Sequence, residues 1–287
     1  MTYSAFIAQH EMSIRMGFAF GVFTLMAGWE LLAPRRSLTV SKVVRWTNNL
    51  GLVFLNTVIL RLLFPAAAVG VAVFASANGW GVLHHFAVPL PVAVVLSLVA
   101  LDFIIYLQHV LVHAVPVLWR LHRVHHADPD YDVTTGSRFH PIEIVLSMLI
   151  KSAAIVVLGA PPLAVVIFEI ILNAMSLFNH GNVRLPLGIE RALRLIVVTP
   201  DMHRVHHSVE GNEANSNFGF NLSIWDRICG TYIDQPREGH QAMTIGINDY
   251  REPRLVSLLP GMLALPFLGE VRGYAINRRE WSRPDDK

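Results

Sequence analysis

Long apolar stretches separated by short polar segments dominate the pattern of this chain. A membrane-spanning helix needs about 20 mostly apolar residues. Five stretches reach this length: residues 14–33, 50–75, 88–112, 142–159 and 162–179. A sixth apolar stretch, 255–269, is short and contains Pro260 and Pro266, so we expect it to be interfacial or re-entrant rather than spanning. The pattern therefore predicts an all-α integral membrane bundle.

The polar connections differ in charge from one side of this bundle to the other. Lys and Arg number four in 34–49, three in 113–141 and eight in 180–254, and none in 1–13, 76–87 and 160–161. Connections rich in Lys and Arg stay in the cytoplasm. The basic segments are thus predicted to be cytoplasmic, with the N-terminus on the other side, and to form a cytoplasmic helical cap.

Charged residues within the predicted spans bear on how the helices are arranged. Lys151 precedes the turn at 160–161 and Glu169 follows it by a similar number of residues. An unpaired charge at this depth is costly, so we predict that the two pair across a tight helical hairpin. The alternative is that each faces a different polar neighbour. Arg61 lies in the middle of the second stretch, so either its side chain snorkels or this span is broken near Pro65.

Composition agrees with a membrane protein and excludes other classes. Of the 287 residues, 53% are hydrophobic and 15% charged, against about 25% charged in soluble domains. The net charge of +2 and the lack of basic runs argue against a nucleic-acid partner. The single cysteine, Cys229, excludes an intrachain disulfide and a multi-cysteine metal site. The first residues lack the basic start and cleavage site of a signal peptide, so we expect them in the mature protein.

Histidines are concentrated where the predicted topology brings segments together. Ten of the 14 lie on one predicted membrane face: His109, His113, His122, His125, His126, His140, His180, His203, His206 and His207. The sequence HRVHH occurs twice, at 122–126 and 203–207, and HVLVH occupies 109–113. Residues three and four apart share a helix face. Three helical segments are therefore able to present eight imidazoles to one point.

This grouping indicates a metal centre. Neutral imidazole binds iron, copper, nickel and zinc, whereas clustered histidines without a metal repel one another once charged. A lone HxxxH pair is more often polar packing, and only the set of three motifs makes metal binding the better interpretation. So many histidines exceed the ligands of one zinc ion, and the HExxH motif of zinc proteases is absent. Two metals are expected, with His10, His84, His85 and His240 as non-ligands.

The histidine motifs and three further segments resemble the fatty acid hydroxylase and sterol desaturase superfamily of membrane di-iron oxygenases. HVLVH, HRVHH and HRVHH follow its HxxxH, HxxHH, HxxHH series. FHPIE (139–143) resembles its His-Pro element and FNHGN (178–182) its extra histidine. NFGFNLSIWDRICGTY (217–232) resembles the segment after its last histidine cluster. The resemblance runs from about residue 100 to 232.

The resemblance implies particular site residues. The metal ligands would be His109, His113, His122, His125, His126, His180, His203, His206 and His207. For His140 a ligand role and a helix-capping role are both open. Many family members carry an acidic residue where Asn215 stands. Asp226 would orient a ligand histidine or pair with Arg227, and Asn182 is a second candidate for such support.

The resemblance also implies the chemistry. Two Fe²⁺ ions would activate O2, with zinc as a substitute metal. A C–H bond of a fatty acyl, sterol or isoprenoid-type lipid would be hydroxylated at the cytoplasmic face of a bacterial inner membrane or an ER membrane. A separate reductase, ferredoxin or cytochrome would supply electrons, because the chain has no GxGxxG fingerprint, cysteine cluster or haem domain. Lipid desaturation, ether-lipid oxygenation and a non-enzymatic metal-binding role stay open.

These observations predict one membrane domain over 1–271, with its catalytic region at about 95–235, and a polar C-terminal tail over 272–287. The expected fold is an all-α membrane bundle. Its cytoplasmic helical cap is expected to carry the histidine-rich dimetal site.

Overall fold

The computed structural model describes residues 3–269, and every regular element among them is helical. Pairing between extended segments is limited to isolated bridges in this part of the chain, such as that between Val197 and Leu222. The predicted all-α class is confirmed. The polar tail predicted for 272–287 lies outside the described residues.

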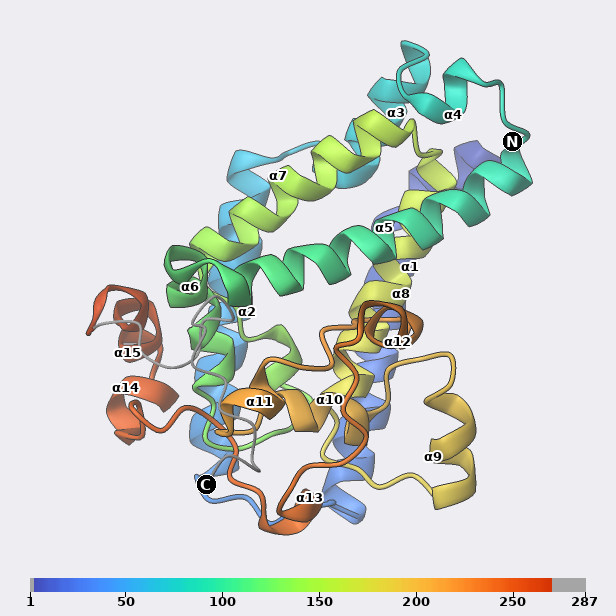
Figure 1. Ribbon diagram of the computed structural model, residues 1–287. Helices are drawn as coiled ribbons and strands as arrows, with labels where there is room; N and C mark the ends of the chain where they lie inside the picture. Colours follow the sequence, from blue (N-terminus) through green and yellow to red (C-terminus); the bar gives the residue numbers. More distant parts are fainter. Residues whose placement is uncertain (1–2, 270–287) are drawn as a thin grey trace.

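The described residues contain five segments that are long and apolar enough to cross a membrane, as the hydrophobic pattern predicted. Their helices are α1 (Tyr3–Leu32), α2 (Lys42–Leu63) with α3 (Ala67–Ala77), α5 (Leu90–Ala114), α7 (Pro141–Leu158) and α8 (Pro162–Asn179). The short α4 (Val82–His85) follows α3. The bundle extends to the upper right of Figure 1, where α3, α4 and the N-terminal end lie.

Pro65 breaks the second predicted span. α2 ends at Leu63 and α3 begins at Ala67, because proline lacks an N–H and its ring disfavours helix in the residue before it. Arg61 therefore lies in the last turn of α2, not in the middle of a continuous helix. Of the two interpretations of this stretch, the broken span is the one found.

α7 and α8 are joined by a short turn, but they diverge and do not form the tight hairpin that was predicted. Gly159 ends α7 in the left-handed conformation (φ 68°), and Pro162 begins α8. α3 and α5 each pack against both helices and hold them apart. Figure 1 shows α7 and α8 leaving the turn in different directions.

A charged triad nevertheless joins these helices inside the bundle. Lys151 Nζ lies 2.5 Å from Glu169 Oε1, which confirms the predicted pair. Arg15 of α1 is a second partner that the sequence did not reveal, with 2.9 Å between its Nη1 and Glu169 Oε2. The long lysine side chain spans the gap between the diverging helices. One carboxylate thus serves two cations on two different helices.

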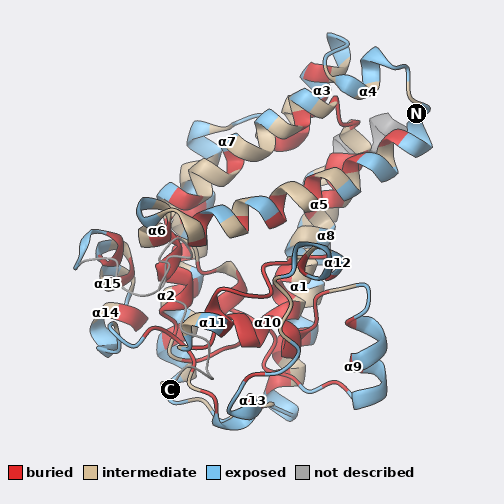
Figure 2. Cartoon of the chain, in the orientation of Figure 1, coloured by how far each residue is buried: buried red, intermediate tan, exposed pale blue. Residues whose placement is uncertain are grey.

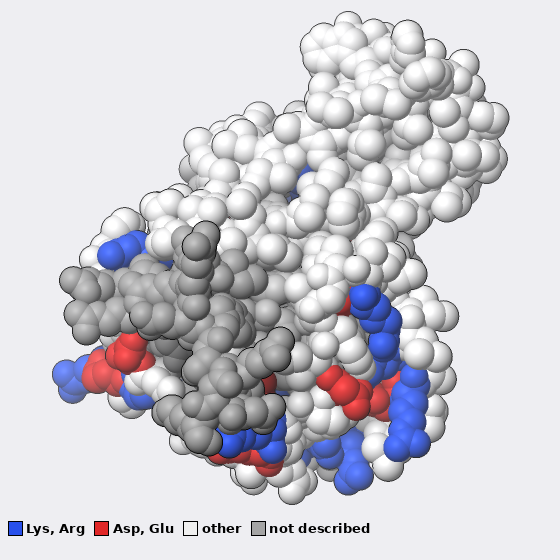
Figure 3. Space-filling model, viewed as in Figure 1, with Lys and Arg blue, Asp and Glu red and all other residues white. Residues whose placement is uncertain are grey.

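The cap consists of residues 115–140 and 180–252, packed on one end of the bundle. Its helices are α6 (Pro116–His126), η1 (Thr135–Ser137), α9 (Leu187–Leu193), α10 (Pro200–His206), α11 (Gly211–Ala214), α12 (Ile224–Cys229) and α13 (Gly239–Ala242). Buried residues gather here in Figure 2, whereas the outer faces of the bundle helices are largely exposed. Figure 3 shows charged side chains over the cap and almost none over the opposite end of the bundle.

The sixth apolar stretch folds as a C-terminal arm and does not span the bundle. It forms α14 (Pro253–Ser257), α15 (Leu259–Ala264) and η2 (Leu265–Phe267). α14 and α15 pack against α2, and η2 packs against α6. Arg123, the arginine of the first HRVHH, donates hydrogen bonds to the carbonyl oxygens of Leu265 and Leu268. The arginine of this motif therefore points away from the histidines and fastens the arm.

Buried ion pairs fasten the acidic loop after α6 to α2. Arg45 donates from Nε and Nη2 to the Asp128 carboxylate, each at 2.8 Å, and from Nη1 to Asp132 at 2.5 Å. Burial alone would raise the pKa of Asp128, but Arg45 and Arg138 lower it to about 2. A buried charge needs such partners. This network fixes the loop between α6 and α7 against α2.

Candidate metal centre

Nine buried histidines form two groups, and within each group one ring nitrogen per residue lies within 4.8 Å of all the others. The five-histidine group comprises His109, His113, His122, His126 and His206. The four-histidine group comprises His125, His180, His203 and His207. These are the nine positions at which the family resemblance implied metal ligands.

Local sequence determines where the histidine-bearing helices begin and end. Val115 is extended and Pro116 opens α6, so the chain turns between the HVLVH motif and the first HRVHH. Thr199 caps α10, accepting a hydrogen bond from the Met202 N–H at 3.3 Å. The second HRVHH thus lies on a short helix whose start is fixed by its own sequence.

Each HRVHH contributes to both groups, in opposite ways. In the first copy (122–126), the first and last histidines belong to the five-histidine group and the middle one to the four-histidine group. In the second copy (203–207) the assignment is reversed. Each group therefore receives an i, i+4 pair from one copy and a single histidine from the other. This exchange explains why one chain carries the same spacing in two unrelated contexts.

Backbone carbonyls orient three of the rings. The Nδ1 atom lies 2.8 Å from Phe218 O in His109, 2.7 Å from Ser216 O in His206 and 2.8 Å from Ser176 O in His180. A carbonyl oxygen only accepts, so each of these Nδ1 atoms carries the proton. The Nε2 atom of each ring is then left with its lone pair directed into the group.

Two side chains orient further rings of the five-histidine group. Glu143 Oε1 lies 2.6 Å from His122 Nδ1, and Asn215 Oδ1 lies 3.3 Å from His113 Nδ1. Such partners fix the tautomer of a metal-binding imidazole and raise its basicity. Sequence reasoning missed Glu143, although it belongs to the FHPIE element. Asn215, where the family resemblance implied an acidic residue, contacts its histidine with an amide oxygen.

Seven buried ring nitrogens of the two groups lack hydrogen-bond partners in the described part of the chain. They are Nε2 of His109, His122, His206 and His207, and Nδ1 of His125, His203 and His207. Within the four-histidine group, His180 Nε2 lies 3.1 Å from His203 Nε2 and 3.2 Å from His125 Nε2. Buried ring nitrogens without a partner are costly, and a bound cation would supply one. The donor set fits two metal ions.

Burial keeps six imidazoles of the two groups neutral. Burial is the largest cause of a lowered pKa in each of them. It lowers the pKa of His180 to about 3. In the other five the pKa is well below the ordinary value: His125, His126, His203, His206 and His207. Neighbouring histidines lower each of these pKa values further. Neutral imidazole is the form that binds metals.

His140 lies outside both groups. Its Nδ1 accepts a hydrogen bond from the Ile142 N–H at 3.2 Å and caps the start of α7. Of the two roles considered for this residue, the capping role is the one found. The four histidines expected to be non-ligands, His10, His84, His85 and His240, are also absent from both groups.

Asp226 supports the centre indirectly. Its carboxylate accepts hydrogen bonds from the N–H groups of Phe218 and Gly219, each at 2.8 Å, and from the Thr231 hydroxyl at 2.7 Å. Burial raises the pKa of Asp226 to about 6. The predicted hydrogen bond to a histidine and the alternative ion pair with Arg227 are both replaced by these contacts among the described residues. Asp226 shapes the turn that places the Phe218 carbonyl against His109.

Asn182 has a different role from the one predicted. Its side chain accepts a hydrogen bond from the Arg36 N–H at 3.0 Å and donates one to the Arg36 carbonyl at 2.9 Å. Its own N–H donates to Glu30 at 2.7 Å. Asn182 thus ties the segment after His180 to α1 and to the connection that follows α1, and these contacts involve no histidine.

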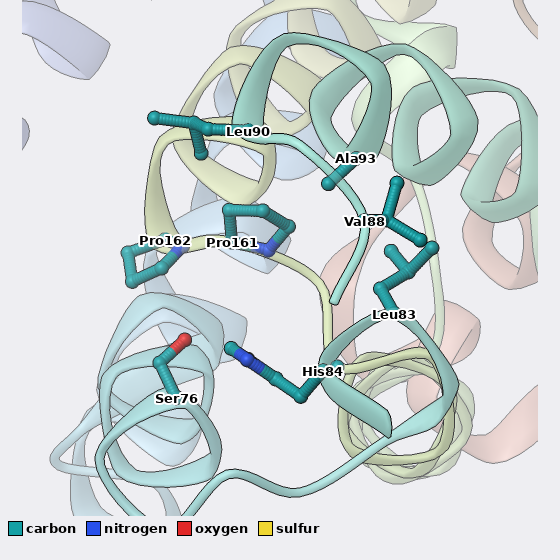
Figure 4. A pocket seen from close by; sticks show the side chains of 9 residues that line it. Ser76, Leu83, His84, Val88, Leu90, Ala93, Pro161 and Pro162 are labelled. Atoms are coloured by element: carbon teal, nitrogen blue, oxygen red, sulfur yellow. The ribbon is translucent and has the colours of Figure 1, made fainter. Parts of the chain in front are cut away.

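A cavity of about 270 Å³ lies at the end of the bundle far from these histidines. It is lined by Ser76, Leu83, His84, Val88, Leu90, Ala93, Gly159, Pro161 and Pro162. Figure 4 shows His84 pointing into it between Ser76 and the two prolines. His84 is the only titratable side chain in this lining, which offers no constellation of reactive groups.

The part of the chain that carries the histidines is similar to known proteins. Residues 94–231, which include all nine histidines, match the fatty acid hydroxylase family model. The ornithine lipid hydroxylase of Rhizobium tropici is 36% identical over 191 residues, which are 67% of this chain and 55% of that relative. The chain belongs to the fatty acid hydroxylase family.

Two further relatives of this fatty acid hydroxylase family member are human proteins. Alkylglycerol monooxygenase is 31% identical over 155 residues, 54% of this chain and 34% of the relative. Cholesterol 25-hydroxylase is 25% identical over 150 residues, 52% of this chain and 51% of the relative. The family member thus matches about half or less of the length of each of these relatives. No solved structure matches it significantly.

Proposed function

We propose that this chain is an O2-dependent lipid hydroxylase whose two histidine groups each hold one iron ion. The observation that carries the proposal is the set of nine buried histidines in two groups, whose ring nitrogens lie within 4.8 Å of one another in each group. The names of the three relatives agree in their chemistry, since each describes oxygenation of a lipid: an ornithine lipid, an alkylglycerol or cholesterol.

The residues of this chain would bind and orient the metals and keep the centre dry. Two iron ions held by these imidazoles would supply the redox chemistry that activates O2 toward a C–H bond. Glu143 and Asn215 hold their histidines in one tautomer. Aromatic rings surround the histidines: Phe139 stacks on His125 with 4.5 Å between ring centroids, and Trp119 lies 4.8 Å from His113. This shell excludes water from the place where the C–H bond would react.

The substrate would reach the centre from the bilayer. The connections rich in Lys and Arg (34–49, 113–141 and 180–254) lie at the cap end of the bundle. We therefore place the cap and the centre at the cytoplasmic membrane face. His109, the most exposed of the nine histidines at 7%, lies on α5, a membrane span. A C–H bond of a lipid chain is the target, and electrons come from a separate reductase, ferredoxin or cytochrome.

Metal content and O2 uptake test this proposal together. His203→Ala/His206→Ala removes one histidine from each group, and His84→Ala/His85→Ala is the matched control far from the centre. Purified wild type and control are expected to bind about two iron ions per chain and to consume O2 only with lipid substrate. The first variant should lose both properties. A single firmly bound zinc without O2 uptake in iron-loaded protein would overturn the proposal.

Ether-lipid oxygenation is the alternative within the same chemistry. Alkylglycerol monooxygenases from four animals are among the relatives, at 28–31% identity. Parallel assays with an alkylglycerol and with an acyl lipid carrying an amino-acid headgroup separate the two substrates. Hydroxylated product from the acyl lipid alone supports the lipid hydroxylase, and aldehyde released from the alkylglycerol alone supports the alternative.

A further inference from the structure

A second cavity, of about 610 Å³, opens on the cap beside α9 and α12. It is lined by Leu187, Glu190, Arg191, Arg194, Leu195, Arg227, Tyr232, Asp234 and Gln235. Three arginines face two acidic residues in this lining, so the cavity carries a net positive charge. None of the nine histidines takes part in it.

One arginine, Arg194, forms ion pairs with both acidic residues of the cavity. Arg194 is buried and pairs with Glu190 at 2.6 Å and with Asp234 at 2.8 Å. Arg191 and Arg227 are exposed, and neither forms an ion pair among the described residues. The Arg227 guanidinium lies 4.0 Å from the centre of the Tyr232 ring and donates to the Arg194 carbonyl at 3.1 Å. The Arg227 guanidinium is thus held in place, and its remaining N–H groups are available to a ligand.

Exposed apolar side chains surround these free arginines. They are Leu187, Ile189, Leu193, Leu195, Ile196, Ile224 and Ile228. A contiguous apolar surface on a protein marks an interaction site. Apolar side chains interleaved with arginines are typical of a helix that lies in the interface of a membrane.

α12 also lies beside a membrane span at half its length. Trp225 Nε1 donates to Asp102 Oδ2 at 2.8 Å, and its ring packs on Phe103 with 4.8 Å between ring centroids. Asp102 is position 13 of the 25 residues in α5 (Leu90–Ala114). Figure 1 shows α12 next to the bundle, and Figure 3 shows charged side chains on the same flank of the cap. The exposed isoleucines of α12 therefore belong to a helix that packs against a membrane span.

We propose that α9 and α12 dock the cap on the bilayer, and that Arg191 and Arg227 bind the phosphate of an anionic phospholipid in this cavity. The planar guanidinium matches phosphate oxygens in a bidentate way. The apolar side chains enter the acyl region beside it. The lipid bound here is distinct from the substrate at the histidines. The proposal depends on the membrane placement of the chain and requires neither bound metal nor turnover.

Lipid retention tests the arginine site. The full chain is placed in bilayer discs of phosphatidylcholine with one-quarter phosphatidylglycerol, extracted gently and examined by native mass spectrometry. Wild type is expected to retain phosphatidylglycerol over phosphatidylcholine by roughly fivefold or more. Arg191→Ala/Arg227→Ala should abolish this preference. Arg237→Ala/Arg254→Ala, which removes two exposed arginines elsewhere on the chain, should leave it unchanged, and equal retention in all three proteins would overturn the site.

The single cysteine tests the docking itself. Cys229 is exposed at the end of α12, so a nitroxide label attached there reports the surroundings of this surface. In the bilayer the label is expected to collide more with O2, which partitions into lipid, than with a water-soluble nickel complex. A label at Asp249→Cys in a Cys229→Ser background, an exposed cap position, should show the reverse. Equal access of the nickel complex to both labels would refute docking whatever the metal content of the protein.

Discussion

Glu143 accepts a hydrogen bond from His122, with 2.6 Å between Oε1 and Nδ1, and both side chains are buried. Among the nine histidines of the two groups, His122 is the one with a carboxylate ion pair in the described chain. The other anchored rings rely on neutral oxygens: three carbonyls and one amide. Glu143 therefore gives one position of the five-histidine group a charge-assisted support that the others lack.

Glu143→Gln should weaken metal binding to the five-histidine group. The variant keeps an acceptor oxygen of similar size but loses the negative charge that strengthens the hydrogen bond from His122. We expect a metal affinity about 10- to 100-fold lower in that group, with the four-histidine group unaffected. Co²⁺ titration against a competing chelator measures both affinities. Glu210→Gln on the cap surface is the control, and two unchanged affinities in Glu143→Gln would contradict the prediction.

Asn215→Asp should act in the opposite direction. It replaces the amide oxygen beside His113 Nδ1 with a carboxylate, so the hydrogen bond becomes charge-assisted. Metal affinity of the five-histidine group is expected to rise by roughly tenfold. The variant also loses the donation from Asn215 Nδ2 to the Gly211 carbonyl at 3.0 Å, which costs about 1 kcal/mol of stability. The same Co²⁺ titration decides, and a lower affinity would show that the amide is the better partner.

His140→Ala should leave metal binding intact. The residue caps α7 and lies outside both groups, so its loss is expected to lower the free energy of unfolding by about 1 kcal/mol. The metal content per chain should equal that of wild type when both are measured by elemental analysis. Loss of one metal in the purified, folded variant would return His140 to the ligand set.

Glu169→Gln should destabilise the bundle more than Lys151→Met does. The first change leaves Lys151 and Arg15 inside the bundle without their carboxylate, at a cost of about 3–5 kcal/mol. The second leaves Glu169 paired with Arg15, so the loss is smaller. Thermal unfolding in bilayer discs provides the comparison. Equal losses would mean that Arg15 does not compensate Glu169, and Lys151→Met/Glu169→Met then tells whether the Lys151 pair matters at all.

The membrane helices and eight of the nine histidines could be predicted from the sequence because both signals are local, whereas His180 was implied only by the family resemblance. An apolar stretch of about 20 residues is visible without any knowledge of its neighbours. The three- and four-residue spacing within 122–126 and 203–207 places histidines on one helix face. The break in the second span was one of two alternatives that the sequence offered, because Pro65 is a local helix breaker.

The division into two groups could not be predicted in the same way. Which histidine of HRVHH enters which group depends on how α6 and α10 lie relative to each other, and no spacing within either motif gives that placement. Glu143 lies 21 residues after His122, so no short spacing connects them. Ser216 and Phe218 contact their histidines through backbone carbonyl oxygens. Every residue type has this carbonyl, so the sequence does not show which residues supply such contacts. Sequence alone therefore indicated the ligand types but not their supports.

The exchange of histidines between the two copies of HRVHH has a consequence for biosynthesis. The five-histidine group is complete only when His206 has been made, and the four-histidine group only when His207 has been made. All five membrane-spanning segments precede these residues in the chain. The nascent protein thus emerges from the ribosome with neither group finished until insertion of its spans is under way, and then both are finished within one residue of each other. The histidine set that the two proposed metals require is therefore complete only late in the synthesis of the chain.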